Sequence, residues 1–227
     1  MARKARVVVP GFPHHVVQRG NRRQKVFFSD KDKQAYIDCL IDYAKPAGLE
    51  FWAYCIMDNH IHLIVVPKEE NSLAKGLSKA HWSYTRMINF RENWRGYLWE
   101  GRFKSCALDE KHLYAAMRYV ERNPVRAKIV SKASDYPWSS AIAHIYKTKS
   151  NLLADNFLVQ DVKNWFAYLE QEDRPIDLDI LRQSTSTQRP IGDAKFVAML
   201  EKITGKILHK QKPGPKNKII RCVSRIK

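Results

Sequence analysis

The most constraining feature of this sequence is a pair of short apolar runs separated by a two-residue turn signal. Residues 50–57 (EFWAYCIM) and 60–67 (HIHLIVVP) each have the length and the residue types of a β-strand. Between them lie Asp58 and Asn59, which suit the tight turn of a hairpin. The pattern therefore predicts two antiparallel strands joined at this turn.

The segments around the hairpin predict further strands and amphipathic helices. Strands are expected at residues 14–20 and 103–108, and helices at residues 29–49, 71–90 and 111–122. The resulting order is strand, helix, strand, strand, helix, strand, helix. This order favours an α+β fold, a ferredoxin-like antiparallel sheet with helices packed on it.

The character of the chain changes after about residue 150, which predicts one domain over residues 1–149 and a helical C-terminal region over residues 150–227. Within that region, residues 161–171 and 192–208 have helical patterns. The segment between them, residues 173–190, is polar and contains proline, and we expect it to be a connection. The basic tail, KQKPGPKNK, is expected to be extended or disordered until a partner binds it.

The charge balance indicates a polyanionic partner. Forty Lys and Arg residues against 23 Asp and Glu residues leave a formal net charge of +17. Such a charge attracts nucleic acid, and no apolar run approaches the length of a membrane-spanning helix. The N-terminal apolar run is too short for a signal peptide, and the four cysteines show no metal-binding spacing. These features predict a cytoplasmic protein with reduced thiols and no membrane partner.

His60 and His62 are candidate metal ligands. Because side chains alternate along a strand, both imidazoles should emerge on the same side of the sheet. That arrangement suits two ligands of one divalent cation, and coordination chemistry by itself favours zinc. The alternative is a half-buried strand that contains two hydrogen-bonded histidines. Two protein ligands also do not complete a metal site.

A second candidate group lies on the predicted helix that ends near residue 122. Tyr119 and Asn123 are four residues apart, so they share one helical face. A phenol can act as a nucleophile toward phosphorus, and an amide oxygen suits a hard cation. The alternative is that Tyr119 is a core aromatic and that Asn123 and Pro124 only begin another helix. Three neighbouring arginines are candidates for phosphate binding: Arg118, Arg122 and Arg126.

Taken together, these segments resemble a known family. The run MDNHIHLIVVP is similar to the histidine-hydrophobe-histidine motif of the HUH nucleases, and RYVERNPVRAKIV resembles the tyrosine segment of the REP-associated tyrosine transposases. Three more segments match that family's pattern in the same order: GFPHHVVQRGN, LWEGRFKS and DYPWSSA. The resemblance covers roughly residues 6 to 145.

The resemblance implies a function and a set of roles. His60 and His62 would bind Mg²⁺ or Mn²⁺, and Tyr119 would be the nucleophile. Asn123 occupies the place of a third ligand, which is Gln in more distant insertion-sequence relatives. The expected activity is metal-dependent cleavage and rejoining of single-stranded DNA at hairpin-forming palindromic repeats, through a 5′-phosphotyrosine intermediate. Residues 1–149 would then be the catalytic domain, and residues 150–227 an accessory DNA-binding region.

The expected DNA contacts come from basic side chains near this site. The candidates for phosphate contacts are Arg19, Arg22, Arg23, Arg102 and Lys104, and for each the alternative is a solvated charge. Trp82 or Trp99 could stack on unpaired bases, although core packing is the more common role of tryptophan.

Two alternative functions stay open at this point. The first alternative function is a DNA-binding module without strand-transfer activity, and the second is a hydrolase of small phosphoesters that uses water. We expect a monomer in preference to a dimer, because members of this family use the tyrosine of the same chain. We also expect the protein to associate with the nucleoid.

Overall fold

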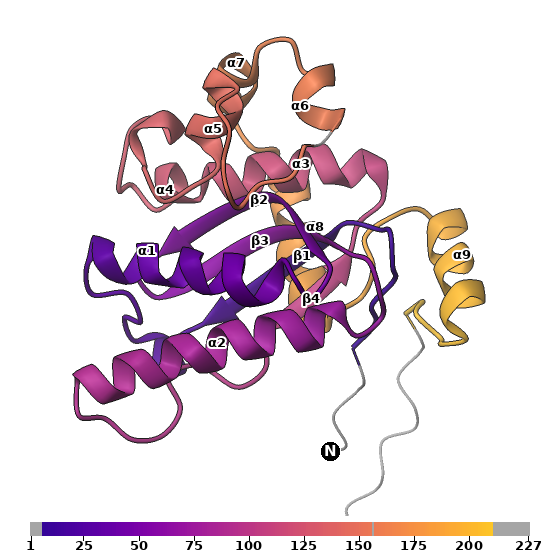
Figure 1. Cartoon of the computed structure of the whole chain (residues 1–227). Helices are drawn as coiled ribbons and strands as arrows, with labels where there is room; N and C mark the ends of the chain where they lie inside the picture. Colours follow the sequence, from indigo (N-terminus) through magenta and orange to yellow (C-terminus); the bar gives the residue numbers. More distant parts are fainter. Residues whose placement is uncertain (1–5, 156, 211–227) are drawn as a thin grey trace, which may run out of the picture.

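The computed structural model describes residues 6–155 and 157–210, and its centre is a four-stranded sheet (Figure 1). The strands lie in the order β2-β3-β1-β4, and every neighbouring pair is antiparallel. This is the order of a ferredoxin-like sheet, so the predicted fold class is confirmed. The strand bounds are β1 His14–Arg19, β2 Leu49–Met57, β3 His60–Pro67 and β4 Lys104–Ala107.

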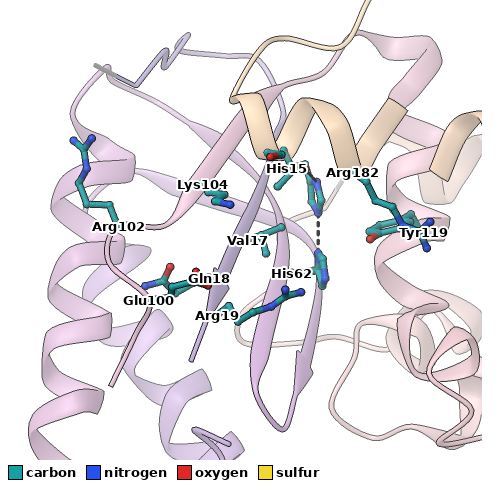
Figure 2. A pocket seen from close by; sticks show the side chains of 12 residues that line it. His15, Val17, Gln18, Arg19, His62, Glu100, Arg102, Lys104, Tyr119 and Arg182 are labelled. Carbon is teal, nitrogen blue, oxygen red and sulfur yellow. Dashed lines mark hydrogen bonds between the residues drawn. The ribbon is translucent and has the colours of Figure 1, made fainter. Parts of the chain in front are cut away.

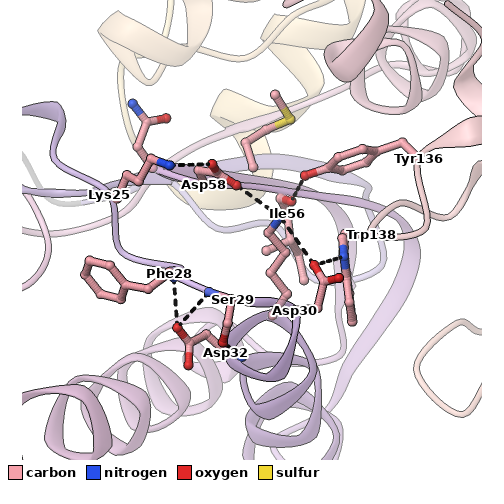
Figure 3. A network of polar contacts seen from close by, with 12 residues as sticks. Lys25, Phe28, Ser29, Asp30, Asp32, Ile56, Asp58, Tyr136 and Trp138 are labelled. Carbon is pink, nitrogen blue, oxygen red and sulfur yellow. Dashed lines mark hydrogen bonds and ion pairs between the residues drawn. The ribbon is translucent and has the colours of Figure 1, made fainter. Parts of the chain in front are cut away.

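The predicted hairpin joins β2 to β3, and ion pairs hold its turn. Asp58 pairs with Lys25 at 3.2 Å (Figure 3). It also pairs with Lys33 at 3.0 Å, and the Lys33 side chain is almost fully buried. Burial raises the pKa of the Asp58 carboxyl, but the two lysines outweigh it, so the pKa lies below its ordinary value. The backbone carbonyl of Asp58 also accepts hydrogen bonds from Val26 and Phe27. The turn immediately before His60 is therefore held from two sides.

Two helices cover one face of the sheet. They are α1 Asp30–Cys39, which continues as a π-helical turn over Leu40–Ala44, and α2 Ser72–Arg91. Ser29 begins α1 with a capping box shared with Asp32. The β3 side chains that pack beneath these helices are Ile61, Leu63 and Val65. Because the side-chain period of a strand is two, His60 and His62 point to the opposite face.

The opposite face is covered by α3 Glu110–Glu121 and by the C-terminal half of the chain (Figure 1). Short helices follow α3: α4 Asn123–Arg126, α5 Ala141–Tyr146, α6 Phe157–Asp161 and α7 Trp165–Glu170. The C-terminal residues Leu158, Trp165 and Leu169 belong to the same apolar cluster as Ala53 and Ile64 of the sheet. The division at residue 149 stays a prediction, but the two parts share one hydrophobic cluster.

The sequence-based interpretation of residues 173–190 as a connection was wrong. Most of this segment forms α8, Pro175–Thr187, which begins with its proline in the first turn, where a missing N–H costs little. The Ser and Thr residues lower its intrinsic helix propensity, but Leu181 is buried in the shared apolar cluster. Tertiary packing therefore overrides the polar composition and places α8 beside β4 and α3.

The predicted helix over residues 161–171 is interrupted in the structure. The chain leaves α6 at Asp161, and Asn164 starts α7 by accepting a hydrogen bond from the backbone of Ala167. The last predicted helix is confirmed as α9, Ala194–Thr204. In the basic tail, residues 211–218 lie outside the described residues. Over the described part of the chain, no helix combines the length and the apolar character needed to cross a bilayer.

Candidate active site

His60 and His62 lie on one face of β3, as the alternation of strand side chains predicts. Their ring centroids are 5.0 Å apart. His60 is held through Nδ1 by the Asn59 side-chain oxygen at 2.6 Å, and His62 is held through Nδ1 by Nε2 of His15 at 3.0 Å. These bonds occupy the Nδ1 atoms of both rings.

Both imidazoles are neutral at physiological pH. Burial, followed by the charges of Arg19 and Arg126, lowers the pKa of His60 to about 4. Burial, followed by the neighbouring His15 and His60, lowers the pKa of His62 well below its ordinary value. A neutral imidazole that donates through Nδ1 keeps a lone pair on Nε2, which is the form that binds a metal. The pair is therefore in a state suited to coordination.

Tyr119 of α3 lies against His62 and against His15 of β1. Its ring centroid is 5.5 Å from that of His62 and 5.8 Å from that of His15, edge to face in both cases. The Arg126 guanidinium sits over the Tyr119 ring at 4.0 Å and donates a hydrogen bond to the Tyr119 carbonyl. The phenol, His62, His15 and the Arg126 guanidinium thus lie together within a single chain.

Tyr119 and His62 open onto a basic cavity of about 220 Å³ (Figure 2). Three of the predicted phosphate-binding residues line it, namely Arg19, Arg102 and Lys104. Its other polar lining residues are His15, Gln18, Glu100, Arg182, Thr185 and Ser186. Glu100 is the one acidic residue in this lining, so the cavity carries a net positive charge that suits a phosphodiester.

Sequence reasoning missed His15 and Arg182. His15 lies on β1, which pairs with β3, and it shares the sheet face of His62. A prediction that these two strands are neighbours would have brought the histidines together. Arg182 comes from α8, and no local signal indicates that this helix returns to the sheet. Figure 2 shows its side chain extending toward Tyr119.

Arg118, Arg122 and Arg126, which the sequence predicts to bind phosphates, surround a carboxylate of the chain itself. Asp173 lies 3.4 Å from Arg118, 3.5 Å from Arg122 and 3.0 Å from Arg126. Asp173 and Arg118 are almost completely buried, and the other two arginines are mostly buried. Phosphate binding by these arginines would require the pairs with Asp173 to open.

Arg22 and Arg23 lie at a separate place, on the exposed turn after β1. A second cavity, of about 270 Å³, is lined by Arg22 and Arg95 together with Trp94 and Tyr97. Tyr97 is 88% exposed, which leaves its ring face available for stacking. Of the two tryptophans considered from the sequence, Trp82 is exposed, whereas Trp99 is buried beneath α1 and α2.

The histidine pair fits a divalent metal if a donor of another type completes the set. Among residues 6–155 and 157–210, no three His, Cys, Asp or Glu side chains are placed to hold a metal. Asn123 follows one turn after Tyr119, and its buried amide nitrogen has no hydrogen-bond partner. Because the two ends of an amide are assigned by their partners, this side chain can present its oxygen instead. The amide oxygen is the kind of donor that Mg²⁺ or Mn²⁺ prefers, whereas the two imidazoles by themselves also suit zinc.

The fold and the site define a class: an antiparallel α+β protein with a histidine pair and a single tyrosine in a basic cavity. The family model described as "Transposase IS200 like" matches residues 9–123, about half of the chain. The chain belongs to this family, and the resemblance found in the sequence is thereby confirmed at the family level. The matched residues contain β1, the histidine pair, Tyr119 and Asn123.

Individual proteins are also similar to this chain. A protein of Haemophilus influenzae (strain Rd), whose name as a REP-associated tyrosine transposase is itself provisional, is 29% identical over 99 residues. That match covers 39% of this chain and 56% of the relative, so the chain spans just over half of the relative's length. A solved structure described as a REP-associated tyrosine transposase bound to a REP hairpin has a TM-score of 0.56 at 19% identity. The match covers 69% of this chain and 93% of that one, and at this identity it supports the fold alone.

Proposed function

We propose that this chain is a single-strand DNA nuclease and strand transferase that uses Tyr119 as its nucleophile. The observation that carries the proposal is the contact between Tyr119 and His62 in the lining of the basic cavity. Packing in a hydrophobic core does not require a tyrosine to lie beside two neutral histidines, His15 and His62, and several cationic side chains. A nucleophile that attacks a phosphodiester needs both.

In the proposed reaction, the Tyr119 oxygen attacks the scissile phosphorus and loses its proton. The bond to the 3′ oxygen breaks, and that oxygen takes up a proton and leaves as a free 3′-hydroxyl. The DNA stays attached to the protein through a 5′-phosphotyrosine. A 3′-hydroxyl can later attack this ester and release Tyr119, so a strand is rejoined without an external energy source.

His60, His62 and Asn123 are the residues that would hold Mg²⁺ or Mn²⁺. When bound, the cation supplies Lewis-acid polarisation of a non-bridging phosphate oxygen. Arg19, Arg102 and Lys104 would bind the backbone on either side of the scissile phosphate. Arg126, whose guanidinium lies over the Tyr119 ring, would orient that ring.

The proposed substrate is single-stranded DNA that carries a hairpin. The solved structure with the similar fold is bound to a REP hairpin, and the curated relative carries the name of a REP-associated protein. The net charge of +17 suits a long polyanion better than a small phosphoester. A DNA-binding module without catalysis is the second candidate, because the cavity lined by Arg22, Arg95 and Tyr97 would serve binding alone.

The test is denaturing electrophoresis of labelled hairpin DNA after incubation with protein and Mg²⁺ or Mn²⁺. The hairpins are taken from palindromic repeats that flank the gene, and Tyr119→Phe is the matched variant. We expect a covalent adduct with the wild-type protein and none with the variant, while both bind the hairpin equally. Equal cutting by both proteins would point to a hydrolase that uses water. Binding without cleavage by the wild-type protein at every flanking repeat would support the binding module.

A further inference from the structure

A chain of three hydrogen-bonded side chains runs from α8 to the histidine pair. Nδ1 of His15 lies 3.0 Å from the Thr185 hydroxyl, and Nε2 of His15 lies 3.0 Å from Nδ1 of His62. All three side chains are buried. Thr185 stands 170 residues after His15 and lies outside the residues that match the family model.

The ring geometry identifies the contact between the histidines as a hydrogen bond in the ring plane. Their ring planes differ by 6°, and their centroids are 5.2 Å apart. A nitrogen–nitrogen distance of 3.0 Å is shorter than the van der Waals separation of stacked rings, about 3.5 Å or more. The rings are therefore displaced sideways, so that a lone pair of one ring faces the N–H of the other.

The direction of the bonds follows from the threonine. The Thr185 hydroxyl donates its single proton to the backbone carbonyl of Leu181 at 2.7 Å. Its oxygen can then only accept toward His15, which makes Nδ1 of His15 the protonated nitrogen. A neutral His15 consequently accepts through Nε2, and the Nδ1–H of His62 is the donor. Nε2 of His62 is left with its lone pair.

We propose that Thr185 and His15 are positioning residues that select the metal-binding tautomer of His62. Reversed hydrogen bonds would put the proton on Nε2 of His62 and turn the only lone pair toward His15. The proposal rests on the proposed function only in assigning His62 as a ligand. It gives α8 a direct role in supporting a candidate metal ligand, whereas the proposed ligands and nucleophile all lie within the first 123 residues.

The first test measures the nitrogen protonation of His62 in the metal-free protein by long-range ¹H–¹⁵N NMR near pH 7.5. We expect a protonated Nδ1 and an unprotonated Nε2 in the wild-type protein. A wild-type His62 that carries its proton on Nε2 would overturn the proposal without any variant. Because neither DNA nor metal is present, this result is separate from the outcome of the cleavage assay.

The second test compares Thr185→Val with Thr185→Ser. Valine keeps the shape of threonine and removes the acceptor, whereas serine keeps the hydroxyl. We expect Thr185→Val to move His62 toward a protonated Nε2 and to weaken Mn²⁺ binding about tenfold, the lower end of the effect of residues that support metal ligands. Thr185→Ser should match the wild type in both measurements. A folded Thr185→Val protein, checked by circular dichroism, with wild-type nitrogen shifts and wild-type Mn²⁺ affinity would refute the role of Thr185.

Discussion

The carboxylate of Asp173 binds the guanidinium of Arg126 at 3.0 Å, and that same guanidinium covers the ring of Tyr119. The segment between α7 and α8 is thereby linked to the proposed nucleophile through one side chain. The same carboxylate also lies 3.4 Å from Arg118 and 3.5 Å from Arg122, so it is shared by three arginines. Removal of this carboxylate should affect both the stability of the C-terminal packing and the orientation of Tyr119.

We expect Asp173→Asn to lower the free energy of unfolding by about 3 kcal/mol, because it leaves buried arginines without their counter-charge. The yield of covalent adduct should fall further than hairpin binding does. Urea unfolding followed by circular dichroism and the adduct assay measure the two effects. Asp179→Asn is the control, since Asp179 is largely exposed and lies 3.9 Å from Arg182. Unchanged stability in Asp173→Asn would contradict a structural role for the cluster.

Lys104→Ala should weaken hairpin binding and reduce its dependence on salt. Each lost phosphate contact lowers the slope of log affinity against log salt concentration by about 1. Fluorescence anisotropy with a labelled hairpin at several salt concentrations gives the slope. Lys31→Ala is the matched control, because Lys31 is exposed on α1 and lies on the other side of the sheet. The same slope in wild type and Lys104→Ala would remove Lys104 from the interface.

Tyr97→Ala should reduce binding of hairpins that carry an unpaired flank. The exposed Tyr97 ring lies beside Trp94, Arg22 and Arg95, a combination that suits a stacked base and its phosphate. Loss of one stacked base costs about 1–3 kcal/mol of binding free energy. A blunt hairpin should show no such loss, and neither should Tyr146→Ala, which removes an exposed tyrosine from α5. Equal losses on both DNAs would argue against base stacking at Tyr97.

The protein should become less stable as the pH falls from about 6.5 to 4. Burial lowers the pKa of His14 to about 4 and the pKa of His81 to about 3. The unfolded chain takes up protons on these side chains below about 6.5, whereas the folded chain does so only near the lowered values. Each such histidine therefore favours unfolding by up to about 1.4 kcal/mol per pH unit within this window.

The midpoints of urea unfolding at pH 7.5, 6 and 5 measure this loss of stability. His15 and His60 have pKa values lowered by burial in the same direction, so they add to it. His81→Gln, which keeps a polar group near the Tyr36 hydroxyl, should flatten the dependence below pH 6. Equal midpoints at pH 7.5 and pH 5 in the wild type would mean that these histidines are not held neutral.

Much of the fold could be predicted because the informative patterns are local. The two-residue period of residues 60–67 placed His60 and His62 on one face, and the structure confirms that face. The antiparallel arrangement followed from the order of strands and helices. The interpretation failed for α8, where a run of Ser and Thr with a proline resembles a connection. Its helical state depends on packing against β4 and α3, and no local pattern reports that packing.

The sequence by itself determined the strands and the hairpin turn. It also determined that His60 and His62 share one face of their strand and that Tyr119 stands four residues before Asn123. These features depend on chain periodicity over a few residues, which can be read locally. Only the tertiary structure decided that Thr185 meets His15, that Arg182 enters the cavity and that Asp173 binds Arg126. Thr185 and His15 are 170 positions apart, and Asp173 and Arg126 are 47 positions apart. Arg182 reaches the cavity only because α8 packs against the sheet. Contacts of that range are determined by how the whole core packs, and single residue types do not encode them.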